Sequence, residues 1–315
     1  MMPDPSRREV LAGTAALLSA QSLPKPRFRG DSRMIPLLDT HQHLWDLDRI
    51  RPPWLPASGP LAGVHDMPRY LKEAEGLNIV KTLYMEVDVA PADHDREADT
   101  VLALCDQPEN PMVGAIIGGR PADEGFARYI GRFAGDRRVR GVRQVLHGGT
   151  PAGYCLERPF VESVRRLGAM GLRFDVCVRA AELPDAAKLA DLCPETVLIL
   201  DHCGNPSVQV RDLSQWRKDI AEVARRPNVW CKISGIVATA KPGEWSAADL
   251  APIVLHCAEV FGRDRILWAS DWPVCKMAAT LAQWVRAAQE IVADWPEADR
   301  RKLFYENGHK AYGLT

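Results

Sequence analysis

Residues 35–43 read IPLLDTHQH, an apolar run that ends in two histidines separated by one residue. Successive side chains of a strand point to opposite faces, so His41 and His43 project on the same side at the end of this run. Two neutral imidazoles at that spacing can chelate a divalent cation. An isolated pair of this kind is more often explained by a histidine that caps a strand, so other strand ends must supply the supporting evidence.

Seven further apolar or β-branched runs follow, spaced on average about 33 residues apart, which suits a strand plus a crossover helix. They lie at residues 79–86, 112–117, 139–146, 172–178, 197–201, 229–234 and 266–270. Helix-like segments separate them at residues 67–77, 96–104, 124–133, 159–170, 181–192, 212–224, 247–261 and 278–293. Continuous apolar strands indicate burial on both faces. Eight such units predict an α/β fold, a single closed (β/α)8 TIM barrel. A doubly wound open sheet is the alternative, but the first run is not followed by a glycine-rich phosphate turn.

The composition is that of an ordinary globular protein. The chain has 315 residues, 46% hydrophobic and 26% charged, with a net charge of -1 and no basic stripe, which argues against a nucleic-acid partner. No run of about 18 apolar residues is present, so we expect no membrane span. The eight cysteines contain no C-x-x-C pair, and several lie in apolar runs, which is typical of small buried side chains.

Residues 1–33 have the features of an export leader. Arg7 and Arg8 precede a short stretch of small and apolar residues at 11–20, followed by a breaker-rich linker at 21–26. The paired arginines resemble a twin-arginine signal, which predicts a periplasmic protein; an attached amphipathic helix on a cytoplasmic protein is the alternative. The folded domain would then be residues 34–315, with 34 basic and 38 acidic side chains.

The catalytic site of a TIM barrel is built where the strands end. Ionisable residues recur at those positions in this chain. Beyond the first strand they are Glu86, Arg143, His147, His202, Lys232 and Asp271. The coincidence of His202 and Asp271 with the histidine pair of the first strand favours a shared site over a strand cap.

Four motifs resemble those of the amidohydrolase superfamily. They are DTHQHLWD at 39–46, LDHCG at 200–204, WCKISG at 230–235 and LWASDWP at 267–273. More narrowly, they resemble its amidohydrolase-2 type sugar-lactonase branch, which includes the fuconolactonase-like and rhamnonolactonase-like hydrolases and the pyrone-dicarboxylate lactonases. The resemblance extends over residues 35–315 and includes YENG at 305–308, which is similar to the family's closing helix.

The resemblance implies roles for individual residues. His41, His43, His202 and Asp271 correspond to the family's metal ligands, and Asp271 to its general base. His202 is also expected to act in catalysis. No lysine that could be carboxylated ends the fourth strand, and no histidine ends the fifth, so a two-metal site is not expected. One divalent ion, zinc, or no metal at all fits this ligand set better.

Other residues are candidates for contact with the substrate. Arg143 could hold a carboxylate or carbonyl through its planar guanidinium, or could form an ion pair between strands. His147 lies just beyond it, before two glycines. Trp45, Trp54 and Trp272 flank the expected mouth, where an aromatic ring could pack on the C–H face of a sugar or simply seal a barrel loop, and Trp45 is taken as the substrate contact. The proline-rich segment 44–70 is the expected lid. Lys232 and Glu86 are expected to pair with one another if both face inward.

These residues predict a hydrolase that opens a sugar-derived or related lactone. Asp271 can accept the proton of the attacking water and return it to the leaving alkoxide. The alternatives are a metal-dependent decarboxylase of the same superfamily and a non-catalytic periplasmic sugar binder. The partner in each case is a small molecule, and self-association into a homo-oligomer remains open.

Overall fold

Eight parallel strands form the centre of the molecule in the computed structural model, which describes residues 34–47 and 49–314. The strands are β1 (Leu37–Gln42), β2 (Ile79–Met85), β3 (Met112–Gly118), β4 (Val139–Val145), β5 (Arg173–Cys177), β6 (Leu198–Leu200), β7 (Val229–Ile233) and β8 (Ile266–Trp268). They pair in the order in which they occur along the chain, from β1 to β8. This arrangement confirms the predicted single (β/α)8 barrel.

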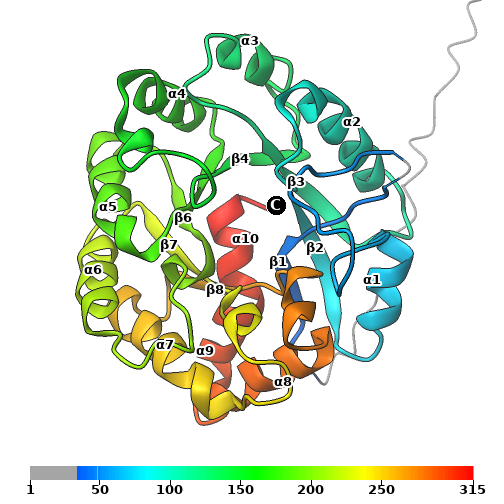
Figure 1. Ribbon diagram of the computed structural model, residues 1–315, viewed down its shortest axis with the longest axis vertical. Helices are drawn as coiled ribbons and strands as arrows, with labels where there is room; N and C mark the ends of the chain where they lie inside the picture. Colours follow the sequence, from blue (N-terminus) through cyan, green and yellow to red (C-terminus); the bar gives the residue numbers. More distant parts are fainter. Residues whose placement is uncertain (1–33, 48, 315) are drawn as a thin grey trace, which may run out of the picture.

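Helices surround this sheet as a ring (Figure 1). The ring consists of α1 (Met67–Glu73), α2 (His94–Cys105), α3 (Phe126–Gly131), α4 (Arg158–Ala169), α5 (Leu183–Leu192), α6 (Ser214–Ala224), α7 (Ala247–Phe261) and α8 (Leu281–Ile291). Two short helices follow in the chain, α9 (Glu297–Arg301) and α10 (Asn307–Tyr312). The predicted helices are all present, although segment 67–77 is helical only as far as Glu73.

The junction between β8 and β1 closes the barrel through a few backbone contacts and through side-chain hydrogen bonds. Gln42 forms a parallel bridge with Trp272, and the amide of His43 donates to the Trp272 carbonyl at 2.7 Å. Deeper in the barrel, the Thr40 hydroxyl donates to the Trp268 carbonyl at 2.8 Å. The chain that carries the two histidines is therefore fastened directly to the segment that follows β8.

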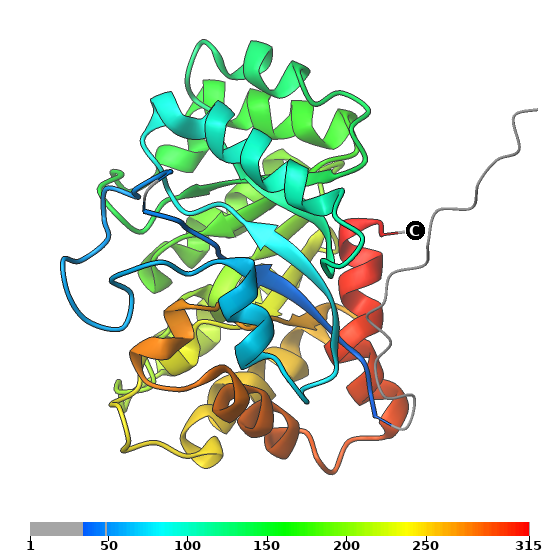
Figure 2. The ribbon, with the colours of Figure 1, turned by 90° about the vertical axis from the view of Figure 1, so that its right-hand side faces the viewer.

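Helix α10 closes the opposite end of the barrel. Figure 1 shows it behind the centre of the strand ring, and Figure 2 shows it on the side away from the long loop that follows β1. Tyr312 of α10 is fully buried and packs in a small apolar cluster with strand residues such as Leu83, Ile116 and Leu267. The larger apolar core lies between the strands and the surrounding helices. Only the end that carries the loops after the strands remains for a site.

Several other predictions can be compared with the described residues. Seven of the eight cysteines are buried, Cys105 is partly buried, and none forms a disulfide, as expected. No helix in the described ranges is long and apolar enough to cross a bilayer. The predicted leader, residues 1–33, lies outside the described residues.

Candidate active site

The two histidines of the first strand and Asp271 meet at the end of the barrel. The Nε2 atoms of His41 and His43 are 3.1 Å apart. Asp271 Oδ1 lies 3.6 Å from the first of these nitrogens and 3.3 Å from the second. All three residues are buried, with exposures of 0%, 5% and 2%. The structure therefore brings these three predicted site residues together.

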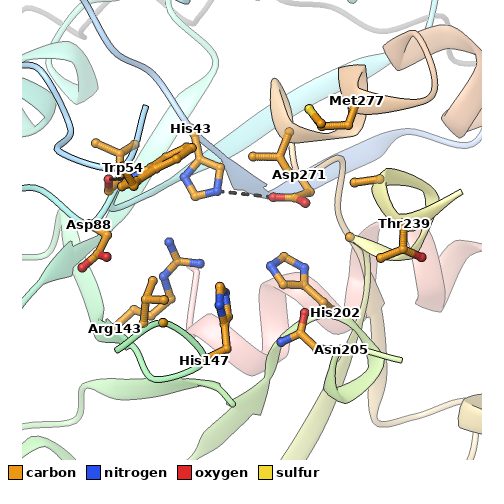
Figure 3. A pocket seen from close by; sticks show the side chains of 16 residues that line it. His43, Trp54, Asp88, Arg143, His147, His202, Asn205, Thr239, Asp271 and Met277 are labelled. Atoms are coloured by element: carbon orange, nitrogen blue, oxygen red, sulfur yellow. Dashed lines mark hydrogen bonds and ion pairs between the residues drawn. The ribbon is translucent and has the colours of Figure 1, made fainter. Parts of the chain in front are cut away.

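Backbone contacts orient Asp271. Its amide donates to the His41 carbonyl at 3.0 Å, and the neighbouring amide of Ser270 donates to Asp39 Oδ1 at 2.8 Å. Asp271 has φ 55°, in the left-handed region that aspartate tolerates better than most residues. The tight turn directs its carboxylate back toward the histidines, and Figure 3 shows it beside the His43 ring, joined to it by a dashed line.

His43 presents an unprotonated nitrogen to the cluster. Its Nδ1 lies 3.0 Å from the Met85 carbonyl oxygen, which can only accept a hydrogen bond. The proton of the neutral ring is therefore on Nδ1, and the lone pair of Nε2 points toward His41 and Asp271. This tautomer is the one that a metal ion or a proton donor requires.

Lys232 contacts His41 in the interior of the barrel. Its ammonium donates to Asp175 Oδ1 at 2.6 Å and Asp201 Oδ1 at 2.8 Å, and it lies 3.2 Å from His41 Nδ1. Tyr312 of α10 donates to the same Asp175 oxygen at 2.6 Å. We call Lys232, Asp175 and Asp201 the polar core; none of the three is exposed to solvent.

The charges of the polar core support one another. Burial alone would raise the pKa of Asp201, but the Lys232 ammonium and His41 hold it well below its usual range. Burial would lower the pKa of Lys232, yet the two carboxylates raise it. Burial raises the pKa of Asp175 to about 6, so this carboxyl is still ionised at neutral pH. One ammonium and two carboxylates thus lie beneath the histidines.

Glu86 pairs with Arg143 and not, as predicted, with Lys232. Arg143 Nε donates to Glu86 Oε1 at 2.6 Å, and its Nη2 donates to the Glu86 carbonyl at 2.7 Å. The prediction was wrong because Lys232 of β7 contacts carboxylates from β5 and from the end of β6, the strand next to β7 in the sheet. Arg143 Nη1 lies 3.2 Å from His41 Nε2, so the guanidinium reaches the cluster.

His202 follows β6 in a left-handed turn with φ 54°. Its Nδ1 lies 2.8 Å from the Ser234 hydroxyl, which leaves Nε2 as the nitrogen available to the cavity. A Cβ on Gly235 would approach the ring to 2.5 Å, so this position needs glycine. Burial lowers the pKa of His202, and the imidazole is neutral at pH 7.

A cavity of about 420 Å³ opens above these side chains (Figure 3). His43, Arg143, His202 and Asp271 form its base, which we call the catalytic floor. His147, predicted as a substrate contact, lines the wall.

Trp45, the other predicted substrate contact, does not line this cavity. Its indole donates to the Gly63 carbonyl at 2.9 Å, and its ring packs edge-on against Trp54. Trp54 is the aromatic residue that lines the cavity. Both tryptophans belong to the predicted lid, and the sequence did not distinguish the one that faces inward. Trp272 is fully buried and packs on His65.

Sequence reasoning also missed two members of the polar core. Asp201 lies inside the LDHCG motif and Asp175 inside an apolar run, and the sequence patterns predict neither as part of the site. A charged residue inside an otherwise apolar strand was the available signal, because a buried carboxylate requires a partner. The partner is Lys232, another charged residue inside an apolar strand.

Comparison with known proteins identifies the family. A family model described as amidohydrolase matches residues 38–314. The chain belongs to the amidohydrolase family. An L-fucono-1,5-lactonase of Burkholderia multivorans is 29% identical to this amidohydrolase over 88% of its chain and 96% of the relative's.

Solved structures show the same fold. A crystal structure of an amidohydrolase from Burkholderia multivorans with bound HEPES is 25% identical, covers 89% of this chain and 100% of that one, and has a TM-score of 0.79. A second crystal structure of an amidohydrolase from that organism, with bound zinc, is 24% identical with the same coverage and TM-score.

A buried carboxyl behind the catalytic floor gives a test of the electrostatics. Burial and the charge of Glu86 raise the pKa of Glu97 to about 8. Its Oε1 accepts from the Tyr84 hydroxyl at 2.9 Å and the Val87 amide at 2.8 Å, while its Oε2 has no partner among the described residues. The folded protein therefore prefers the protonated form, in which one oxygen can donate.

We expect the stability contribution of Glu97 to be lost as pH rises. The unfolded carboxyl titrates near 4.5 and the folded one near 8, so the free energy of unfolding falls by about 1.4 kcal/mol per pH unit across this window. Glu97→Gln, which keeps the acceptor and cannot ionise, should flatten that slope in urea unfolding between pH 5 and 8. Glu195→Gln, at an exposed position, is the control. Equal slopes in wild type and Glu97→Gln would contradict the assignment.

Proposed function

We propose that this amidohydrolase hydrolyses a lactone, with Asp271 as the general base that delivers water to the ring carbonyl. The observation that carries the proposal is the position of Asp271 Oδ1 on the catalytic floor, 3.3 Å from the unprotonated nitrogen of His43. The Burkholderia multivorans relative named as a lactonase supports the reaction class. A sugar-derived or related lactone is the substrate that the sequence motifs indicate.

The floor provides each group that the reaction needs. A carboxylate at Asp271 can take the proton of a water molecule as its oxygen attacks the carbonyl carbon. The tetrahedral intermediate places negative charge on the former carbonyl oxygen, and Arg143 lines the cavity with N–H groups that Glu86 does not use. When the ring C–O bond breaks, the proton held by Asp271 passes to the departing alkoxide, which becomes the hydroxyl of the product.

Asp271→Asn should abolish this reaction. The amide cannot accept the proton of water, so we expect kcat/KM for lactone hydrolysis to fall at least about 100-fold. Thermal stability should stay near that of wild type, because the backbone contacts of residue 271 do not involve its side chain. The matched control is Asp88→Asn, a carboxylate of the cavity wall that pairs with Arg120, where we expect less than a tenfold change.

Two results would contradict the general-base role. One is an Asp271→Asn variant that keeps a tenth or more of the wild-type rate. The other is a wild-type protein that binds lactones without opening them, as a periplasmic sugar binder would. A wild-type protein that releases carbon dioxide from aromatic carboxylates and leaves lactones intact would instead be a decarboxylase.

The donor atoms of the cluster fit one divalent ion. The amidohydrolase superfamily is typically metal-dependent, and zinc bound at about 2.0–2.1 Å by a tetrahedral ligand set requires donors about 3.4 Å apart. The three separations among His41 Nε2, His43 Nε2 and Asp271 Oδ1 are 3.1, 3.6 and 3.3 Å. A zinc ion held by these atoms would polarise the carbonyl or lower the pKa of bound water.

The tautomer of His41 decides whether that ligand set is complete. Its Nδ1 lies 3.2 Å from the Lys232 ammonium and 3.5 Å from Asp201 Oδ1. Only a proton on Nδ1, directed at Asp201, leaves a lone pair on Nε2. His202 falls in a separate group with His41 and Asp201, where Lys232 already contacts two members. We therefore propose His41, His43 and Asp271 as the ligands, with His202 facing the substrate.

Elemental analysis tests the metal proposal directly. Protein purified without chelator should contain about one equivalent of zinc, and His43→Ala should contain none. EDTA should remove the metal and lower activity. The barrel should stay folded, because the ion pairs of Lys232 with Asp175 and Asp201 do not include a proposed metal ligand. His256→Ala, which alters a partly exposed histidine on α7, is the control and should keep its zinc. Wild-type protein that is free of metal and fully active would contradict the proposal.

We also propose that residues 1–33 form a twin-arginine leader and linker that direct the domain at residues 34–315 to the periplasm. The support is the sequence alone: Arg7 and Arg8, the small-residue stretch after them and the linker. A reporter fused to residues 1–33 should accumulate in the bacterial periplasm, and Arg7→Lys with Arg8→Lys should retain it in the cytoplasm. A reporter whose location ignores the double substitution would contradict the proposal.

A further inference from the structure

The walls of the cavity differ in chemistry from its floor. Above the catalytic floor, apolar side chains enter from the end of β4 and from the segments that follow four other strands. They are Trp54, Val87, Val145, Ala238, Val274 and Met277. Figure 3 shows Trp54 and Met277 on opposite sides of the opening. At about 420 Å³ the cavity lies in the range of pockets that bury drug-sized ligands, so a lone lactone ring would fill only part of it.

The polar side chains on one side of the wall already have protein partners. The Thr239 hydroxyl donates to the Ile236 carbonyl at 2.8 Å and accepts from the Val208 amide at 3.0 Å. The side-chain amide nitrogen of Asn205 donates to the Val178 carbonyl at 2.8 Å. These groups hold the loops after β6 and β7 together, and few of their hydrogen-bonding positions remain for a ligand.

The other side of the wall shows the same pattern. The indole N–H of Trp54 donates to the Val87 carbonyl at 2.7 Å, so the ring offers only carbon atoms to the cavity. Asp88 forms an ion pair with Arg120 at 2.8 Å. His147 forms no hydrogen bond with another described residue and is exposed at the mouth, where water can also reach a ligand.

The rim of the cavity leaves apolar surface in water. Trp54 is 42% exposed and Met277 is 43% exposed, although most large apolar side chains of the described chain are buried. Covering such surface with a ligand is favourable, and covering it with hydroxyl groups is not. The rim and the walls therefore both favour a ligand with apolar groups.

We propose that the lactone opened by this protein carries an alkyl or aryl substituent, which packs between Trp54 and Met277, and is not a ring with a hydroxyl on each carbon. This inference rests on the proposed lactone hydrolysis and narrows the sugar-derived substrate that the sequence indicates. Each methylene moved from water to the wall should raise kcat/KM about fourfold. Each hydroxyl buried without a partner should lower it about tenfold.

A panel of six-membered lactones tests the substrate class. It compares unsubstituted δ-valerolactone, its δ-alkyl derivatives from methyl to pentyl, the aryl-fused dihydrocoumarin, and D-glucono-1,5-lactone. We expect kcat/KM to rise along the alkyl series and to be at least about 100-fold lower for the glucono compound than for the pentyl compound. A glucono-1,5-lactone rate equal to or above the alkyl rates would overturn the inference and leave lactone hydrolysis intact.

Variants of the rim connect the selectivity to the named residues. Trp54→Ala and Met277→Ala should each reduce the dependence of kcat/KM on chain length. Leu255→Ala, which removes an exposed apolar side chain on α7, should not. An unchanged dependence in both rim variants would overturn the placement of the substituent.

A binding measurement separates failure of this inference from failure of the proposed function. In Asp271→Asn, calorimetry compares 5-hydroxydecanoate with gluconate, which are the open-chain products of the pentyl and glucono compounds. Tighter binding of the decanoate supports the apolar wall even if wild type opens no lactone, in which case only the proposed function fails. Equal or tighter binding of gluconate would overturn the inference.

Discussion

The buried ammonium of Lys232 is the interaction on which the catalytic end of this barrel depends. A charge at 0% exposure is tolerated only with close counter-charges, and Asp175 and Asp201 provide them at 2.6 and 2.8 Å. The same ammonium lies 3.2 Å from His41 Nδ1, so the charge balance of the interior also positions a residue of the cluster. Tyr312 adds a hydrogen bond from α10 to Asp175, which links the closing helix to the polar core.

Closure of the barrel and assembly of the site are one structural event. The strand that carries the histidines meets the end of β8 through the Asp271 amide, which donates to the His41 carbonyl. Backbone hydrogen bonds therefore fix the position of Asp271, the proposed general base, relative to the strand that carries His41 and His43. The loops supply the apolar walls, whose side chains can vary without disturbing the floor. A fixed floor with variable walls suits the TIM barrel, a fold in which related enzymes can keep one reaction and differ in substrate through their loops.

The sequence predicted the fold and the floor well because both are local patterns. Apolar runs at regular spacing identify strands, and polar residues at their ends identify His41, His43, His202 and Asp271. It failed where the answer depends on which residues meet across the barrel. Lys232 was predicted to form an ion pair with Glu86. The residue pattern of one strand does not show which side chains reach it from other strands of the barrel. Trp45 was preferred to Trp54 because a long loop has no periodicity that tells an inward ring from one packed behind it.

The central claim is that Asp271 delivers water to a lactone carbonyl and does not attack the carbonyl itself. Single-turnover hydrolysis in water enriched in oxygen-18, with enzyme in excess over lactone, tests this claim most directly. Mass spectrometry of the first-turnover hydroxy acid should show one heavy oxygen in its carboxylate, because that oxygen comes from solvent. A first-turnover product without the label, accompanied by a labelled Asp271 carboxylate, would show that Asp271 acts as a nucleophile and would contradict the account.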